Sequence, residues 1–186
     1  MASYREYFNP GTGEWIQYLV TGAESDGELV RYRWRSVPGG SIPMHFHPRQ
    51  EERFEIESGE AHFTREGEEI VAGPGETVVI PAGARHSERN PGREEVRGVV
   101  ELRPALGAKE MHEMFAGLHA DGMATSGGAP RNPLRLGATF WHFRNDIRVE
   151  SPPPWLQNVF LPPLWALGRA VGIEPYCERW NSTESG

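Results

Sequence analysis

The stretch from Gly39 to Asn90 constrains the fold of this chain more than any other part of it. Short runs of alternating apolar and polar residues are separated there by glycine and proline, as in Pro81-Ala82-Gly83. Alternation with a period of two predicts strands with one buried face, and the glycines and prolines predict turns between them. The 16 prolines and 22 glycines of the whole chain suit such a turn-rich fold. We therefore predict a mainly antiparallel β domain.

Three histidines in this stretch can converge on one point. His45 and His47 are separated by a single residue, and in an extended strand such residues project from the same face, roughly 6.5–7 Å apart along it. Their imidazoles can therefore share one metal ion. His86 follows the turn at 81–83 and begins another strand.

A carboxylate completes the set, and alternation decides which of two glutamates points inward. Glu52 shares its face with apolar residues, whereas Glu51 is in register with charged ones. Pro48 predicts a bend that returns Glu52 to the histidine face. The inward face then consists of Glu52, Phe54 and Ile56, and the outward face of Arg53, Glu55 and Glu57.

These spacings resemble the two sequence motifs of the cupin superfamily. The first is Gly39-x5-His45-x-His47-x4-Glu52-x6-Gly59, and the second is Gly75-x5-Pro81-x-Gly83-x2-His86-x3-Asn90. The fifteen residues between Gly59 and Gly75 are typical of small microbial cupins. The resemblance implies an all-β fold, an antiparallel jelly-roll barrel, in which His45, His47, Glu52 and His86 bind one divalent metal ion.

The chain divides near Pro104 into a predicted cupin β-barrel domain (1–104) and a helical C-terminal extension (105–186). Further barrel strands are predicted at 15–20, 29–37, 77–80 and 95–102. In the extension, helices are predicted at 107–120 and 133–144, and a third apolar stretch at 155–171 is interrupted by Pro162 and Pro163. We expect this extension to pack on the barrel or on a partner subunit, and it resembles C-terminal extensions of uncharacterised bacterial cupins.

The inward faces of the strands suggest a substrate. The side-chain orientations inferred from alternation place four residues in the cavity of the barrel. Their apolar and aromatic character favours a small, aromatic or polyketide-like organic substrate. The strand at 95–102 has no cleanly apolar face, so Arg97 and Glu101 either face the cavity or, as we favour, are exterior charges. The four predicted substrate-binding residues are Tyr32, Trp34, Phe54 and Ile56.

Three imidazoles and a carboxylate give a divalent ion a net charge of about +1 and leave one or two positions open. Such ligands accept iron, manganese, nickel, copper or zinc. A redox metal supports a dioxygenase-type oxidation, the reading we favour, in which Glu52 can leave the metal and act as a catalytic base. A redox-silent metal supports cyclase, isomerase or lyase chemistry instead. A non-catalytic, small-ligand-binding cupin is the contrasting class.

Composition excludes several other classes. A net charge of −7 argues against nucleic acid as a partner, and a single lysine, Lys109, argues against a Schiff-base enzyme. Cys177 is the only cysteine, so no disulfide can form within the chain. The first ten residues lack the apolar core of a signal peptide, and we expect a cytoplasmic protein.

The remaining expectations concern partners and the other histidines. The prolines and Arg169 in the stretch 155–171 argue against a membrane span, and membrane contact is not expected. Cupin barrels commonly pair, so we expect a homodimer through the first strand or the C-terminal arm. An interfacial membrane contact of that stretch is the minority interpretation. The four histidines outside the motifs are treated as non-ligands: His62, His112, His119 and His142.

Overall fold

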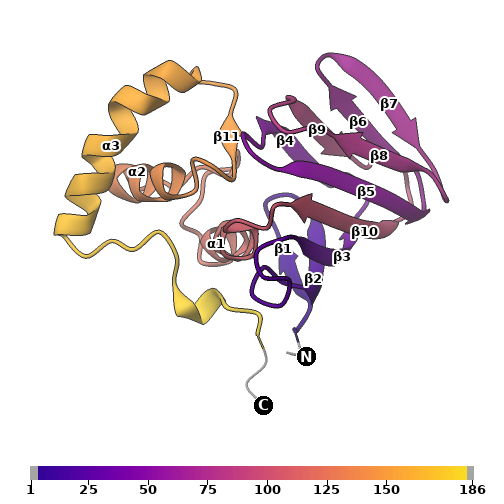
Figure 1. Cartoon of the computed structure of the whole chain (residues 1–186), viewed down its shortest axis with the longest axis horizontal. Helices are drawn as coiled ribbons and strands as arrows, with labels where there is room; N and C mark the ends of the chain where they lie inside the picture. The colour runs from indigo at the N-terminus through magenta and orange to yellow at the C-terminus, as the bar shows by residue number, and fades with distance from the viewer. Residues whose placement is uncertain (1–3, 184–186) are drawn as a thin grey trace.

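A computed structural model describes residues 4–183 and contains two antiparallel sheets flanked by helices (Figure 1). The first sheet has the strand order β1 (Tyr7–Asn9), β2 (Glu14–Val20), β3 (Val30–Ser36), β10 (Val96–Arg103), β5 (Glu51–Ser58) and β8 (Thr77–Ile80). The second has the order β11 (Arg148–Val149), β4 (Ser41–Phe46), β9 (His86–Arg89), β6 (Ala61–Arg65) and β7 (Glu68–Ala72).

The two sheets fit a jelly roll, but they do not close into one barrel. The edge strands of the first sheet are β1 and β8, and those of the second are β11 and β7. No ladder between described residues joins one sheet to the other. The expected closed barrel is therefore corrected to two facing sheets that no strand ladder within residues 4–183 joins.

Alternation within β3 explains how the first sheet is oriented. Tyr32 and Trp34 are buried, whereas Arg31 and Arg35 lie outside and form ion pairs with Glu55 and Glu95. The same holds for β10, where Arg97 is exposed and Glu101 pairs with arginines at 2.6 and 3.6 Å. Both residues are thus exterior charges, as favoured from the sequence.

Large aromatic side chains fill the space between the sheets. The ring centroid of Phe54 lies 5.6 Å from that of Trp34 and 4.9 Å from that of Phe63, and all three side chains are 1% exposed. Aromatic pairs at such distances contribute roughly 0.5–1.5 kcal/mol each beyond the burial of their area. Gly59 turns the chain between β5 and β6 with a φ of 78°, a conformation that favours glycine.

The C-terminal part of the chain contains α1 (Ala108–Ala120), α2 (Pro133–His142), α3 (Pro154–Ala170) and the short 3-10 helix η1 (Glu178–Trp180). α3 continues through Pro162 and Pro163, the two prolines that interrupt its apolar stretch in the sequence. Gly137 lets α2 and α3 approach closely, since a Cβ there would lie 2.3 Å from that of Leu164. Within residues 4–183, no helix has the length and apolar character needed to cross a membrane.

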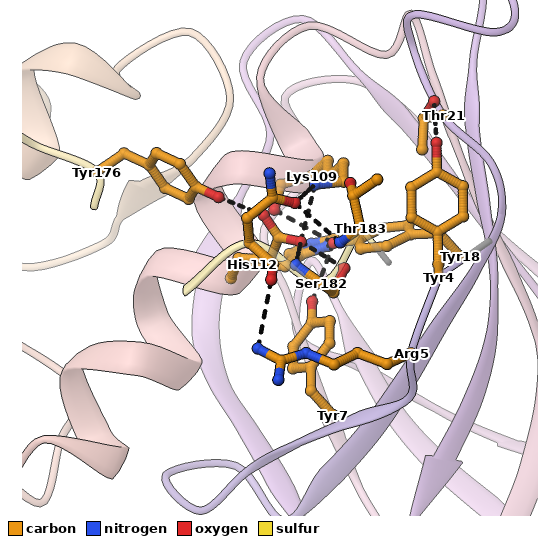
Figure 2. Close-up of polar contacts among 12 residues, drawn as sticks. Tyr4, Arg5, Tyr7, Tyr18, Thr21, Lys109, His112, Tyr176, Ser182 and Thr183 are labelled. Carbon is orange, nitrogen blue, oxygen red and sulfur yellow. Dashed lines mark hydrogen bonds and ion pairs between the residues drawn. The ribbon is translucent and has the colours of Figure 1, made fainter. Parts of the chain in front are cut away.

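A buried carboxylate fastens the end of the chain to α1. Glu113 is 1% exposed and accepts hydrogen bonds from Lys109 at 2.8 Å, from the Tyr176 hydroxyl at 2.9 Å, and from both the backbone and the hydroxyl of Ser182. Figure 2 shows Lys109, Tyr176 and Ser182 gathered at this point, beside Tyr18 of the first sheet. The network joins α1, the C-terminal segment and the sheet.

Candidate metal centre

Four side chains from three parts of the two sheets converge in the interior. The ligand atoms of His45, His47, Glu52 and His86 all lie within 4.8 Å of one another. His45 on β4 is directly opposite His86 on β9, His47 follows β4 by one residue, and Glu52 lies on β5. All four are at most 6% exposed. Glu51 is exposed, so alternation identified the correct glutamate.

The backbone fixes the tautomer of each histidine. The Nδ1 atoms of His45, His47 and His86 lie 2.8, 2.5 and 3.0 Å from the carbonyl oxygens of Pro43, Asp146 and Ala84. A carbonyl only accepts, so each Nδ1 carries the proton and donates. Each neutral ring therefore presents the lone pair of its Nε2 atom to the interior, which is the atom that a metal ion requires.

The arrangement of these lone pairs fits a cation. The Nε2 atoms of His45 and His47 are 3.3 Å apart, and Glu52 Oε2 lies 3.0 Å from Nε2 of His86 and 3.5 Å from that of His47. Two unprotonated nitrogens at that distance repel each other unless a positive charge lies between them. Ligands about 2.0–2.2 Å from one ion are separated by about 3 Å when adjacent. The observed spacing is therefore that of ligands around one ion.

The electrostatics of the cluster differ from one member to the next. Burial lowers the pKa of His45 well below its usual value, and the neighbouring His86 and His47 lower it further. Burial alone would raise the pKa of Glu52, but the interactions with His47 and His86 outweigh it and hold that pKa well below the usual range. Glu52 is thus ionised. Burial would lower the pKa of His86, but its hydrogen bond to Glu52 and the charge of Glu52 outweigh burial and raise that pKa, so without a metal ion His86 binds a proton more readily than His45 does.

A cavity of about 540 Å³ adjoins the cluster and is lined mainly by apolar side chains. One wall comes from the sheets and includes His45, His47 and Glu52, and the other comes from α1, α2, α3 and the segment around β11. The C-terminal part of the chain thus builds much of the site. The apolar lining includes Met111, Phe115, Leu136, Phe140, Leu156 and Leu161.

Only one of the four predicted substrate-binding residues borders this cavity. Tyr32 lines it, whereas Trp34, Phe54 and Ile56 belong to the packed core and are absent from its wall. These three share the inward face of their strands with Tyr32 or Glu52, but the space before them is filled by side chains from the opposite sheet. Substrate contact by Tyr32 stays a prediction that the cavity favours.

Two histidines of α1 line the cavity, although the sequence analysis treated them only as non-ligands. His112 packs against Tyr32 with ring centroids 5.3 Å apart, and its Nδ1 lies 3.5 Å from the Tyr18 hydroxyl. Burial lowers the pKa of His112 to about 4, although the charge of Glu52 opposes the shift. His119 presents an Nε2 atom that is buried without a described partner. Neither belongs to the four-residue cluster, and their spacing of seven on one helix was the available signal.

Glu14 is a further polar group that the sequence analysis missed. It is 6% exposed, lines the cavity, and accepts a hydrogen bond from Trp34 Nε1 at 2.8 Å. Burial raises its pKa, and the charge of Glu52 adds to the shift. The register of Glu14 with Ile16 and Tyr18 on β2 could have revealed it, because an acidic residue on an apolar strand face points inward.

Comparisons with known proteins agree with this fold and centre. Residues 32–100 match the family model described as "Cupin domain". Residues 32–100 are therefore similar to a cupin domain.

Individual relatives cover only parts of the chain. The structure of a predicted oxalate decarboxylase from Thermotoga maritima is 20% identical, with a TM-score of 0.50, over 55% of this chain and 93% of that one, which shows the shared fold. A recombinant oxalate oxidase in complex with glycolate is 29% identical over 50% of this chain and 52% of that one, with a TM-score of 0.44. Mannose-1-phosphate guanylyltransferase ManC of Salmonella typhimurium is 31% identical over 90 residues, 48% of this chain and 18% of its own. The chain spans about a fifth of that curated relative.

Proposed function

We propose that this protein is a metal-dependent cupin enzyme in which His45, His47, Glu52 and His86 hold one divalent ion. The observation that carries the proposal is the convergence of three Nε2 atoms and one carboxylate. A four-residue set leaves one or two positions free on an ion such as iron, manganese, nickel, copper or zinc. Ions that serve structure alone are normally enclosed by protein ligands, so open positions beside a cavity favour catalysis.

The cavity supports a small, mostly apolar substrate of aromatic or polyketide-like character. Its volume of about 540 Å³ is within the range of small-molecule sites, and Tyr32 offers an aromatic ring close to the centre. Oxalate, named for the Thermotoga maritima protein, is a small dianion and would be poorly matched to this wall. The same holds for the sugar phosphate named for ManC.

We infer an oxidation of the dioxygenase type, with cyclase, isomerase or lyase chemistry as the alternative for the same residues. A bound redox ion supplies one-electron chemistry toward a chelating substrate and dioxygen, and zinc supplies Lewis acidity. In this scheme Glu52 leaves the metal and accepts a proton from the substrate; its ionised carboxylate at the edge of the cavity supports this role. The apolar wall excludes water, and His112 and Tyr32 can orient a polar group of the substrate.

Metal content measured on the untagged protein by mass spectrometry tests the centre. We expect about one ion per chain, and loss of that ion in the double variant His45→Ala/His86→Ala. His62→Ala is the matched control, because His62 lies on the same sheet, pairs with Glu60 and is outside the cluster. Absence of stoichiometric metal from the wild type, or its persistence in the double variant, would refute the proposed site.

The identity of the metal then separates the two chemistries. With iron, manganese, nickel or copper, we expect oxygen consumption in the presence of apolar aromatic substrates, and its loss in Glu52→Gln. With zinc, we expect non-oxidative turnover and no oxygen consumption. A metal-loaded protein that turns over no substrate of either kind would support the non-catalytic alternative.

A further inference from the structure

The outer face of α3 is apolar and has no partner in the described chain. Figure 1 shows α3 as the outermost helix, on the side of the molecule opposite β7. Trp155, Val159, Phe160, Leu167 and Val171 are 57–67% exposed. Such exposure is unusual for several large apolar side chains on one helix, and contiguous patches of this kind mark interaction sites.

Helix geometry shows that the patch is continuous. At 100° per residue, the exposed apolar residues fall within one arc of roughly 160°. The exposed polar residues of the helix, Asn158 and Arg169, lie outside that arc. We call this arc the α3 face; it consists of Trp155, Val159, Phe160, Pro163, Ala166, Leu167, Ala170 and Val171.

The surroundings of the α3 face are basic, although the whole chain is acidic. From Arg131 to Val171 the sequence carries five arginines and two acidic residues, whereas the remainder carries 14 basic and 24 acidic residues. One of the two acidic residues, Asp146, is buried, and the other, Glu150, pairs with Arg85 at 3.3 Å. Another carboxylate, Glu174, follows just beyond this segment.

Arginines lie at both ends of α3. Near its beginning, Arg148 donates to Asn158 at 3.0 Å, and near its end Arg169 lies over the ring of Trp165, 5.3 Å from its centroid. Arg135 on α2 donates to the carbonyl of Glu174 at 2.9 Å, which also places it near the end of α3. An apolar helix face is thus bordered by guanidinium groups.

We propose that the α3 face docks on an anionic membrane surface, with α3 lying in the plane of the lipid headgroups. Apolar side chains including a tryptophan would enter the headgroup region, and the bordering arginines would contact lipid phosphates. The two sheets lie on the side of the molecule away from α3 (Figure 1), and salt screens the repulsion between the membrane and acidic residues that are distant from it. No membrane span is required, in agreement with the lengths of the helices.

The cavity strengthens this assignment. Phe160 is 57% exposed and also lines the cavity, and Leu156, Leu161 and Leu164 of α3 line it as well. An apolar ligand dissolved in lipid would meet the cavity at the docked helix. A second copy of the chain fits less well, because a two-fold contact would bring Arg135, Arg148 and Arg169 of one copy toward the same arginines of the other.

Co-sedimentation of the full-length protein with vesicles tests the proposal. We expect binding to vesicles of phosphatidylcholine mixed with phosphatidylglycerol, and much weaker binding to phosphatidylcholine alone. Binding should weaken as salt is raised. Light scattering without lipid should show a mass that does not depend on the residues of the α3 face.

Two double variants separate the apolar and the charged contributions. Val159→Gln/Leu167→Gln should lower the partition coefficient at least about tenfold. Arg135→Gln/Arg169→Gln should lower it roughly fivefold per arginine on anionic vesicles. Val71→Gln is the matched control, because Val71 is 52% exposed on the distant strand β7, and it should bind as the wild type does.

All variants change exposed or half-exposed side chains, so circular dichroism should show wild-type folding. Failure of the wild type to bind anionic vesicles would overturn the proposal. An equal loss in Val71→Gln would also overturn it, because binding would then not depend on the α3 face. A dimer that Val159→Gln/Leu167→Gln converts to a monomer would assign the face to a second copy instead.

Discussion

Replacement of Glu113 by alanine should destabilise the protein strongly. Its side chain is fully buried and binds Lys109, Tyr176 and Ser182. The alanine variant would leave the Lys109 ammonium, only 13% exposed, without its anionic partner. Removing one member of a buried ion pair typically costs about 3–5 kcal/mol. Lys109 keeps a hydrogen bond to Asn181 at 3.0 Å, which places the expected loss near the lower limit, about 3 kcal/mol.

Urea unfolding of the metal-free protein measures this loss directly. For a chain of this size, about 3 kcal/mol corresponds to a fall in Tm of roughly 6–12 °C. The double variant Lys109→Met/Glu113→Leu should recover most of the stability, because it removes both charges together. A loss below about 1 kcal/mol for Glu113→Ala, or a double variant no more stable than the single one, would refute the reasoning.

Three further predictions concern the core and the centre. Burial raises the pKa of Glu14 in the folded state, so wild-type stability falls as the pH rises above the unfolded pKa of 4.5. In urea unfolding, the stability of Glu14→Gln relative to the wild type should therefore increase over that pH range. Glu57→Gln is the control for the lost charge, and a stability difference that does not change with pH would contradict the prediction. Gly137→Ala should cost about 1–3 kcal/mol in the same assay by forcing α2 away from Leu164, whereas Gly127→Ala, with ordinary contacts, should cost less than 0.5 kcal/mol. A chelator should lower the Tm of the purified protein and added metal restore it, since ligand at a hundredfold over Kd contributes about 2.7 kcal/mol, and an unchanged Tm would contradict the site.

The sequence could predict those parts of the fold that depend on local pattern. Alternation placed β2, β3, β8 and β10 within a residue or two, and the helical spacing of Met111, Met114 and Leu118 predicted α1. It could not predict β11, because two residues carry no periodicity and that strand forms only by pairing with β4. A helical arm was expected over 155–171, but the sequence could not show that α3 continues through Pro162 and Pro163, where packing against α2 compensates for two missing backbone donors.

The sequence could likewise predict one part of the candidate site but not the other. The spacing of His45 and His47, and the register that separates Glu52 from Glu51, are local properties of strands and were readable. The helical wall of the cavity could not be predicted from the sequence, because it depends on how α1 packs against the sheets and so places His112 beside Tyr32. The carbonyl of Asp146 that fixes His47 comes from 99 residues away. Local sequence pattern therefore identified the four residues of the cluster but not the cavity beside them.

Crystals of the metal-loaded protein would test the central claim most directly, through anomalous scattering at the absorption edge of the bound metal. The account predicts one strong peak within bonding distance of the Nε2 atoms of His45, His47 and His86 and of a Glu52 oxygen. A peak elsewhere, or no peak between these four residues in crystals grown with excess metal, would contradict it.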